Sequence, residues 1–106
     1  MRILLDHGTP APLRRALADH SVATAYEKGW ATLTNGALLT AAEDAFDVFV
    51  TSDQNLRYQQ NLAGRRLAIL VLPTTSWPRL RPHAALIAQA IASLGAGELQ
   101  EWFPPE

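Results

Sequence analysis

Two aspartates each follow a short run of apolar residues: Asp6 follows residues 3–5, and Asp53 closely follows residues 48–51. Carboxylate oxygens are ligands that Mg²⁺ and Mn²⁺ prefer in proteins. Two carboxylates can hold one hydrated Mg²⁺, because this ion keeps several of its waters. Such an ion activates water and stabilises an in-line displacement at phosphorus. The elements between Asp6 and Asp53 decide whether these side chains meet.

Length and composition narrow the classes of protein. The 106 residues fit a single domain, 1–106, and 48% hydrophobic with 18% charged residues predicts a packed core rather than disorder. The chain has no cysteine, which excludes disulfides, thiol catalysis and cysteine-ligated metals. A formal net charge of −1 excludes a general polycation for duplex DNA.

Short apolar runs that are typical of buried parallel strands alternate with segments of helical periodicity. Strands are predicted at residues 3–5, 22–25, 48–51 and 67–72, with an extra C-terminal edge strand within 98–103. Helices are predicted to begin at Thr9-Pro10, at Thr34-Asn35, near Gln54 and at His83. This alternation predicts an α/β fold, a three-layer α/β/α sandwich with a mostly parallel sheet and right-handed crossovers.

The predicted strand order is 2-1-3-4, in which the winding reverses between the first and third strands. Ligands bind at such a switch point, beyond the carboxyl ends of the strands. Asp6 and Asp53 both lie at this edge, on strands about 4.8 Å apart. Glu43, Asp44 and Asp47 precede the third strand and therefore belong to the opposite edge.

Other polar side chains share the predicted edge and leave alternatives open. Asp53 either caps the next helix or joins Asp6 in holding a metal or substrate. Glu27 either supplies a third carboxylate or faces solvent, and His7 either transfers protons or fills space. The five arginines between Arg57 and Arg81, a stretch without acids, form either a phosphate-binding surface or an ordinary solvated one. The aromatic residues near this edge either stack on bases or pack over the strand ends: Trp30, Tyr58 and Trp77.

Three stretches of the chain resemble the short PIN-like proteins. They are Ile3-Leu4-Leu5-Asp6, then Gly29-Trp30 with Asn35-Gly36 and Leu38-Leu39, and finally 47–56 with its continuation Tyr58-Gln59-Gln60-Asn61-Leu62-Ala63-Gly64-Arg65-Arg66. The resemblance covers nearly the whole chain. These proteins are similar to VapC-type toxins, which are Mg²⁺- or Mn²⁺-dependent ribonucleases paired with antitoxins. The resemblance therefore implies a PIN-like domain and a ribonuclease.

The resemblance assigns roles to individual residues. Asp6 matches the acid of the first strand and Asp53 the acid after the third, so these two would hold one Mg²⁺ or Mn²⁺. His7 stands where the family commonly has Glu, and it joins both aspartates as a catalytic candidate. Asn35 and Asn55 stand where acids are frequent. The candidates for substrate binding are Asn35, Thr51, Asn55, Arg57, Arg79 and Arg81.

Two functions remain open. The first is a toxin ribonuclease with an RNA substrate and a small DNA-binding antitoxin as partner. The second is a catalytically degraded relative that binds RNA or antitoxin without cleavage. We expect a cytoplasmic protein, since the sequence has neither a signal-peptide core nor a spanning segment, and a homodimer through helix 84–94 is open. A receiver-like phosphoacceptor is disfavoured by Asp6-His7 and a single lysine, and no phosphate-loop or serine-hydrolase motif is present.

Overall fold

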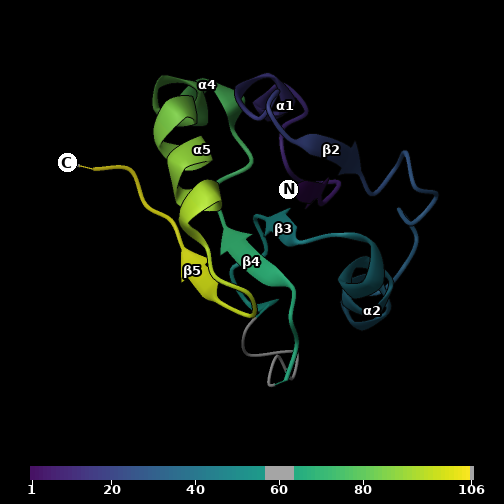
Figure 1. The fold of residues 1–106 in the computed structure, drawn as a ribbon. Coiled ribbons are helices and arrows are strands. Elements are labelled where there is room, and N and C mark those ends of the chain that lie inside the picture. The colour runs from purple at the N-terminus through teal and green to yellow at the C-terminus, as the bar shows by residue number, and fades with distance from the viewer. Residues whose placement is uncertain (57–63, 106) are drawn as a thin grey trace.

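A five-stranded sheet organises the chain, and every strand in it runs parallel to its neighbours (Figure 1). The computed structural model describes residues 1–56 and 64–105. The strands are β1 (Arg2–Leu5), β2 (Ser21–Thr24), β3 (Val48–Thr51), β4 (Ala68–Val71) and β5 (Leu99–Glu101). Their order in the sheet is β2-β1-β3-β4-β5. The predicted order of the first four strands and the extra C-terminal edge strand are confirmed.

The helices connect these strands. They are α1 (Leu13–Ala16), α2 (Asn35–Ala45), α4 (Trp77–Leu80), the 3₁₀ helix η1 (Arg81–His83) and α5 (Ala84–Ser93). The helix predicted to begin near Gln54 falls largely on 57–63, outside the described residues. Within the part of the chain that the structure describes, no helix is long and apolar enough to cross a membrane.

The two predicted helix caps have different outcomes. The hydroxyl of Thr34 accepts a hydrogen bond from Ala37 N at 3.4 Å, so the predicted N-cap of α2 is confirmed. Thr9 does not cap a helix, because its hydroxyl donates to the carbonyl of Val50 at 3.1 Å and ties the loop to β3. The helix predicted to begin there starts only at Leu13.

Side-chain alternation along the strands builds two cores, one on each face of the sheet. Ile3 and Leu5 belong to the core that contains the buried side chains of α1 and α5. Leu4 and Phe49 belong to the core that contains those of α2. The sheet therefore carries α1 and α5 on one face and α2 on the other, and every residue of β3 and β4 is buried.

Two connections on the same face of the sheet have opposite hands. The chain passes from β1 over α1 to β2 in one direction across the sheet, and from β4 over α5 to β5 in the opposite direction. Parallel connections on one face change hand when their direction reverses, so one of the two is left-handed. The prediction that all crossovers are right-handed is therefore wrong for one of them. Ile87 and Ile91 hold α5 on the face of α1, and β5 fills the free edge beside β4.

The turn between α5 and β5 requires a glycine. Gly97 has φ +77°, and a Cβ at this position would lie only 2.7 Å from the carbonyl oxygen of Arg65. Its N–H donates to the carbonyl of Arg66 at 2.8 Å, which holds the turn against the start of β4. Only a residue without a Cβ can approach the backbone this closely.

Replacement of Gly97 by alanine should destabilise the fold more than the same change at other glycines. Gly97→Ala should lower the free energy of unfolding by about 1–3 kcal/mol through backbone strain, and the contact with Arg65 adds to this. Gly29 has φ +75° but open space around it, so Gly29→Ala should cost less. Gly95→Ala, with neither constraint, should change stability by no more than about 0.5 kcal/mol. Urea unfolding of the three variants measures this order, and equal losses would contradict it.

Candidate functional site

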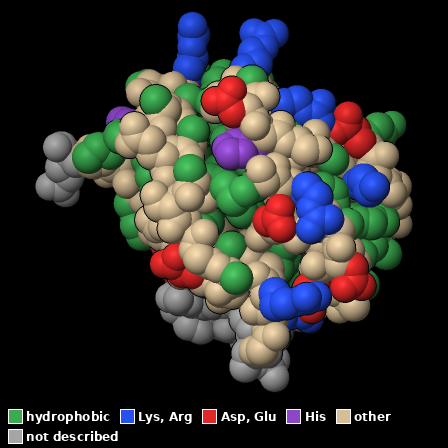
Figure 2. Space-filling view, viewed as in Figure 1, with side chains coloured by type: hydrophobic (Ala, Val, Ile, Leu, Met, Phe, Trp, Pro, Cys, Tyr) green, Lys and Arg blue, Asp and Glu red, His purple; other side chains and the backbone are tan. Residues whose placement is uncertain are grey.

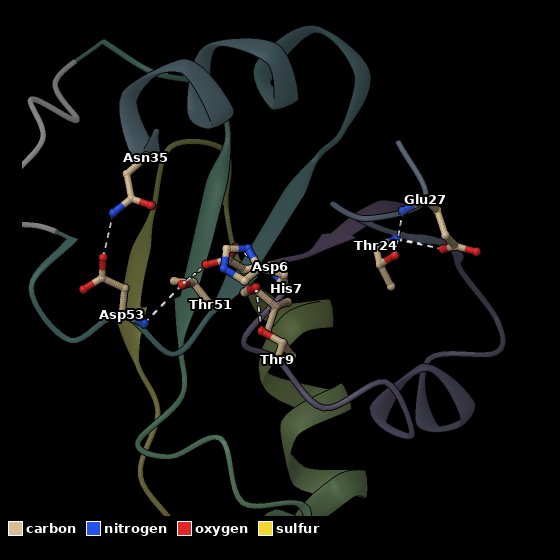
Figure 3. A network of polar contacts seen from close by, with 9 residues as sticks. Asp6, His7, Thr9, Thr24, Glu27, Asn35, Thr51 and Asp53 are labelled. Carbon is tan, nitrogen blue, oxygen red and sulfur yellow. Dashed lines mark hydrogen bonds and ion pairs between the residues drawn. The ribbon is translucent and has the colours of Figure 1, made fainter. Parts of the chain in front are cut away.

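The hydroxyl of Thr51 joins the two aspartates at the carboxyl ends of β1 and β3. It donates to Asp6 Oδ2 at 2.9 Å and accepts from the backbone N–H of Asp53 at 3.1 Å (Figure 3). The side chain of Thr51 is completely buried, and its bond to Asp6 is buried with it. The buried hydroxyl of Thr51 therefore connects the side chain of Asp6 with the backbone of Asp53.

Strand alternation explains why these side chains meet. Leu4 pairs in register with Phe49, and both side chains lie on the face covered by α2. Asp6 and Thr51 each lie two residues further along, so the same alternation directs both side chains to that face. The Asp6 N–H donates to the carbonyl of Val50 at 2.9 Å, which extends the ladder between the two strands as far as the acid.

Asp6 is nearly buried, and its carboxylate is held by neighbouring donors. Besides the Thr51 hydroxyl on Oδ2, the backbone N–H of His7 donates to Oδ1 at 2.9 Å. The His7 ring nitrogen Nδ1 lies 3.2 Å from the same oxygen, while most of the His7 side chain is exposed. His7 thus sits between the Asp6 carboxylate and solvent, where an imidazole can exchange protons.

Asp53 makes a different set of contacts. Its Oδ2 accepts a hydrogen bond from Asn35 Nδ2 at 2.8 Å, and its Oδ1 accepts one from the backbone N–H of Asn55 at 3.0 Å. The second bond closes a turn two residues on, a common use of aspartate after a strand. Figure 3 shows the carboxylate turned to Asn35 at the start of α2, on the other side of Thr51 from Asp6. Asn35 and the backbone of Asn55 thus hold the Asp53 carboxylate in this position.

Among the described residues, the partners of both carboxylates are neutral groups and the ring of His7. No lysine or arginine in the described ranges pairs with Asp6 or Asp53. Two carboxylates at one sheet edge repel each other when both are ionised, unless a positive charge comes near. Within the described residues, no lysine or arginine offsets this repulsion.

Glu27 does not join this pair. Its carboxylate accepts hydrogen bonds from the Arg14 guanidinium and from the backbone N–H of Thr24. The bond from Arg14, then that from Thr24, holds the pKa of Glu27 below its ordinary value. Figure 3 places Glu27 beyond the end of β2, apart from Asp6 and Asp53. In residues 1–56 and 64–105, no group of three or more acidic or histidine side chains is placed to hold one metal ion.

The acid predicted at the opposite edge is found there. Asp47 accepts a hydrogen bond from the backbone N–H of Arg2 at 2.8 Å and pairs with its guanidinium at 3.3 Å. The backbone bond first, and then the guanidinium, keep the pKa of Asp47 below its ordinary value. This carboxylate is an exposed acid already paired, and it provides a natural control for Asp6 and Asp53.

The remaining candidates are the arginines and aromatic residues that the sequence places near this edge of the sheet. Arg79 and Arg81 are exposed on α4 and η1, whereas Arg57 and Tyr58 lie outside the described residues. Trp30 packs edge-to-face on Phe46 with ring centroids 6.1 Å apart, which supports the packing interpretation of this residue.

No protein-family model, curated protein or solved structure matches this chain.

A substitution that removes the Thr51 hydroxyl but keeps the shape of the side chain should destabilise the protein. Thr51→Val deprives a nearly buried carboxylate of one donor and a backbone N–H of its acceptor, so the free energy of unfolding should fall by about 1–3 kcal/mol. Thr51→Ser keeps the hydroxyl and loses only a methyl group, at a cost of about 1 kcal/mol. Urea unfolding compares the two variants. A valine variant as stable as the parent would show that the hydroxyl does not join the two aspartates.

Proposed function

We propose that this chain is a PIN-like, metal-dependent ribonuclease that acts as the toxin of a toxin–antitoxin pair. The observation that carries the proposal is the link from Asp6 through the buried Thr51 hydroxyl to Asp53. It holds two acids from distant parts of the chain at the switch point of a parallel sheet. The proposal includes the three-layer α/β/α sandwich of such domains, a small DNA-binding antitoxin and a cytoplasmic setting.

The donor atoms at this edge suit one hard divalent cation. Asp6 and Asp53 supply carboxylate oxygens, and the neighbours that now hold them are chiefly neutral hydrogen-bond donors. Asp6 and Asp53 would therefore hold one hydrated Mg²⁺ or Mn²⁺, and Asn35 would release Asp53 as the ion enters. The bound cation would supply an activated water and would offset charge on the phosphate.

The surrounding side chains would act on the substrate itself. His7 is exposed beside Asp6, so its ring would carry a proton between the reacting oxygens and solvent. Asn55 is exposed beyond Asp53 and would contact a phosphate oxygen. Arg79 and Arg81 would contact phosphates further along the RNA, because guanidinium groups bind phosphate through two parallel bonds.

A second function is favoured by the present position of Asp53. Its carboxylate is already satisfied by Asn35 and Asn55, and Glu27 is held elsewhere by Arg14. A protein in which the Asp53–Asn35 bond persists would bind RNA or an antitoxin and would not cut. In that case Asp53 is a structural residue that fixes the start of α2 to the end of β3.

A cleavage assay with matched variants separates the two functions. Structured RNA should be cut by the parent protein only with Mg²⁺ or Mn²⁺. Asp6→Asn and Asp53→Asn should each reduce the rate by about 100-fold or more, because the charge stabilisation that a metal supplies is worth several kcal/mol. Asp47→Asn removes an acid at the opposite edge and should retain the parent rate.

Cleavage retained in both site variants, or equal loss in Asp47→Asn, would contradict the metal-site proposal. RNA binding without cleavage, with or without the metals, would favour the second function. Urea unfolding of all three variants checks that loss of rate is not loss of fold.

A further inference from the structure

A groove of about 750 Å³ runs between α1 and the segment that carries α4, η1 and the start of α5. Pro12 and Arg15 line it from the side of α1, and Trp77, Arg81 and Ala84 line it from the other side. Figure 1 shows α1 and α4 next to each other at one end of the molecule. Figure 2 shows basic side chains projecting from this end.

The arginines of the groove differ in their partners. Arg14 is fixed on one wall, since its guanidinium donates to Glu27 and to the carbonyl of Val22. Arg15 and Arg81 are exposed, and no acid in the part of the chain described pairs with either of them. Neighbouring Arg79 likewise has no acidic partner there. Within residues 1–56 and 64–105, the groove therefore presents arginines without an acidic partner beside an indole ring.

One loop connects the candidate site with the groove, since it begins at Asp6 and ends at Pro12. The loop from Asp6 to α1 passes Gly8, where a Cβ would lie 3.3 Å from Ser52 Oγ and 3.8 Å from Thr75 Cγ2. This loop is thus packed between the segments that follow β3 and β4. Its far end supplies Pro12 to one wall of the groove, and Trp77 on the other wall lies two residues after Thr75.

We propose that this groove binds a single-stranded segment of RNA, with Arg15 and Arg81 on its phosphates and Trp77 stacked on a base. The inference rests on the proposed function, since it names the path of the substrate away from the cleavage site. Single-stranded nucleic acid is bound in this way by other proteins, through a positive groove and aromatic rings that tolerate any base. An acidic protein surface would use the arginines but would have no use for a stacking ring.

Binding without cleavage can be measured in EDTA, with a fluorescein-labelled oligouridine and fluorescence anisotropy at several salt concentrations. Arg15→Gln and Arg81→Gln should each weaken binding several-fold, and each should reduce the slope of log K against log salt by about 0.7. Arg66→Gln is the control, because Arg66 is also exposed but pairs with Asp44 at 4.0 Å at the opposite edge.

The stacking role of Trp77 is tested in the same assay. Trp77→Leu should weaken binding by about 5- to 100-fold, whereas Trp77→Phe keeps an aromatic ring and should retain most of the affinity. Trp77 is partly buried against the core, so urea unfolding of both variants separates loss of stacking from loss of fold. Equal weakening by leucine and phenylalanine in folded protein would overturn the stacking role.

Three outcomes would overturn the groove assignment. They are no binding by the parent protein, equal weakening by Arg66→Gln, and competition by poly-glutamate as effective as that by unlabelled RNA. The proposed function is tested separately. If binding depends on Arg15 and Arg81 but no metal-dependent cleavage occurs, the nuclease proposal is contradicted and the groove assignment stands. If metal-dependent cleavage occurs and is unaffected by Arg15→Gln and Arg81→Gln, the groove assignment is contradicted and the nuclease proposal stands.

Discussion

One buried hydroxyl, that of Thr51, determines how the acidic edge of the sheet is arranged. It bonds at once to the Asp6 carboxylate and to the backbone of Asp53, in a position that water does not reach. Leaving either partner unsatisfied there costs more free energy than an exposed hydrogen bond contributes. The contact therefore fixes the ends of β1 and β3 relative to each other, and it sets where Asp6 and Asp53 can act.

The larger features of the fold follow from local patterns in the sequence. Short apolar runs ending in Asp6 and near Asp53 predict parallel strands, and the alternation of strands with helices predicts their order. Because the strands are parallel and Asp47 comes just before β3, it is placed at the opposite edge, where the structure shows it paired with Arg2. These predictions succeed because burial of apolar strands and the direction of parallel chains leave few other solutions.

The details of the site depend on contacts between distant residues, which local patterns do not reveal. Glu27 is turned away by Arg14, thirteen positions earlier in the chain. Asp53 accepts a hydrogen bond from Asn35 at the start of α2. Strand alternation indicates that the side chains of Asp6 and Thr51 face this helix, but it does not reveal the bond between Asp53 and Asn35. The start of α1 differs from the prediction because Thr9 bonds to Val50, and one of the two connections over α1 and α5 has the unexpected hand because α5 packs on the face of α1.

The central claim is that Asp6 and Asp53 converge on one divalent cation. The anomalous scattering of Mn²⁺ in crystals of this protein tests it most directly. The account predicts a single peak within about 2.1 Å of a carboxylate oxygen of each residue, with Asp53 moved away from Asn35. Crystals in which Asp53 keeps its bond to Asn35, and in which no peak contacts either carboxylate at millimolar Mn²⁺, would contradict the claim.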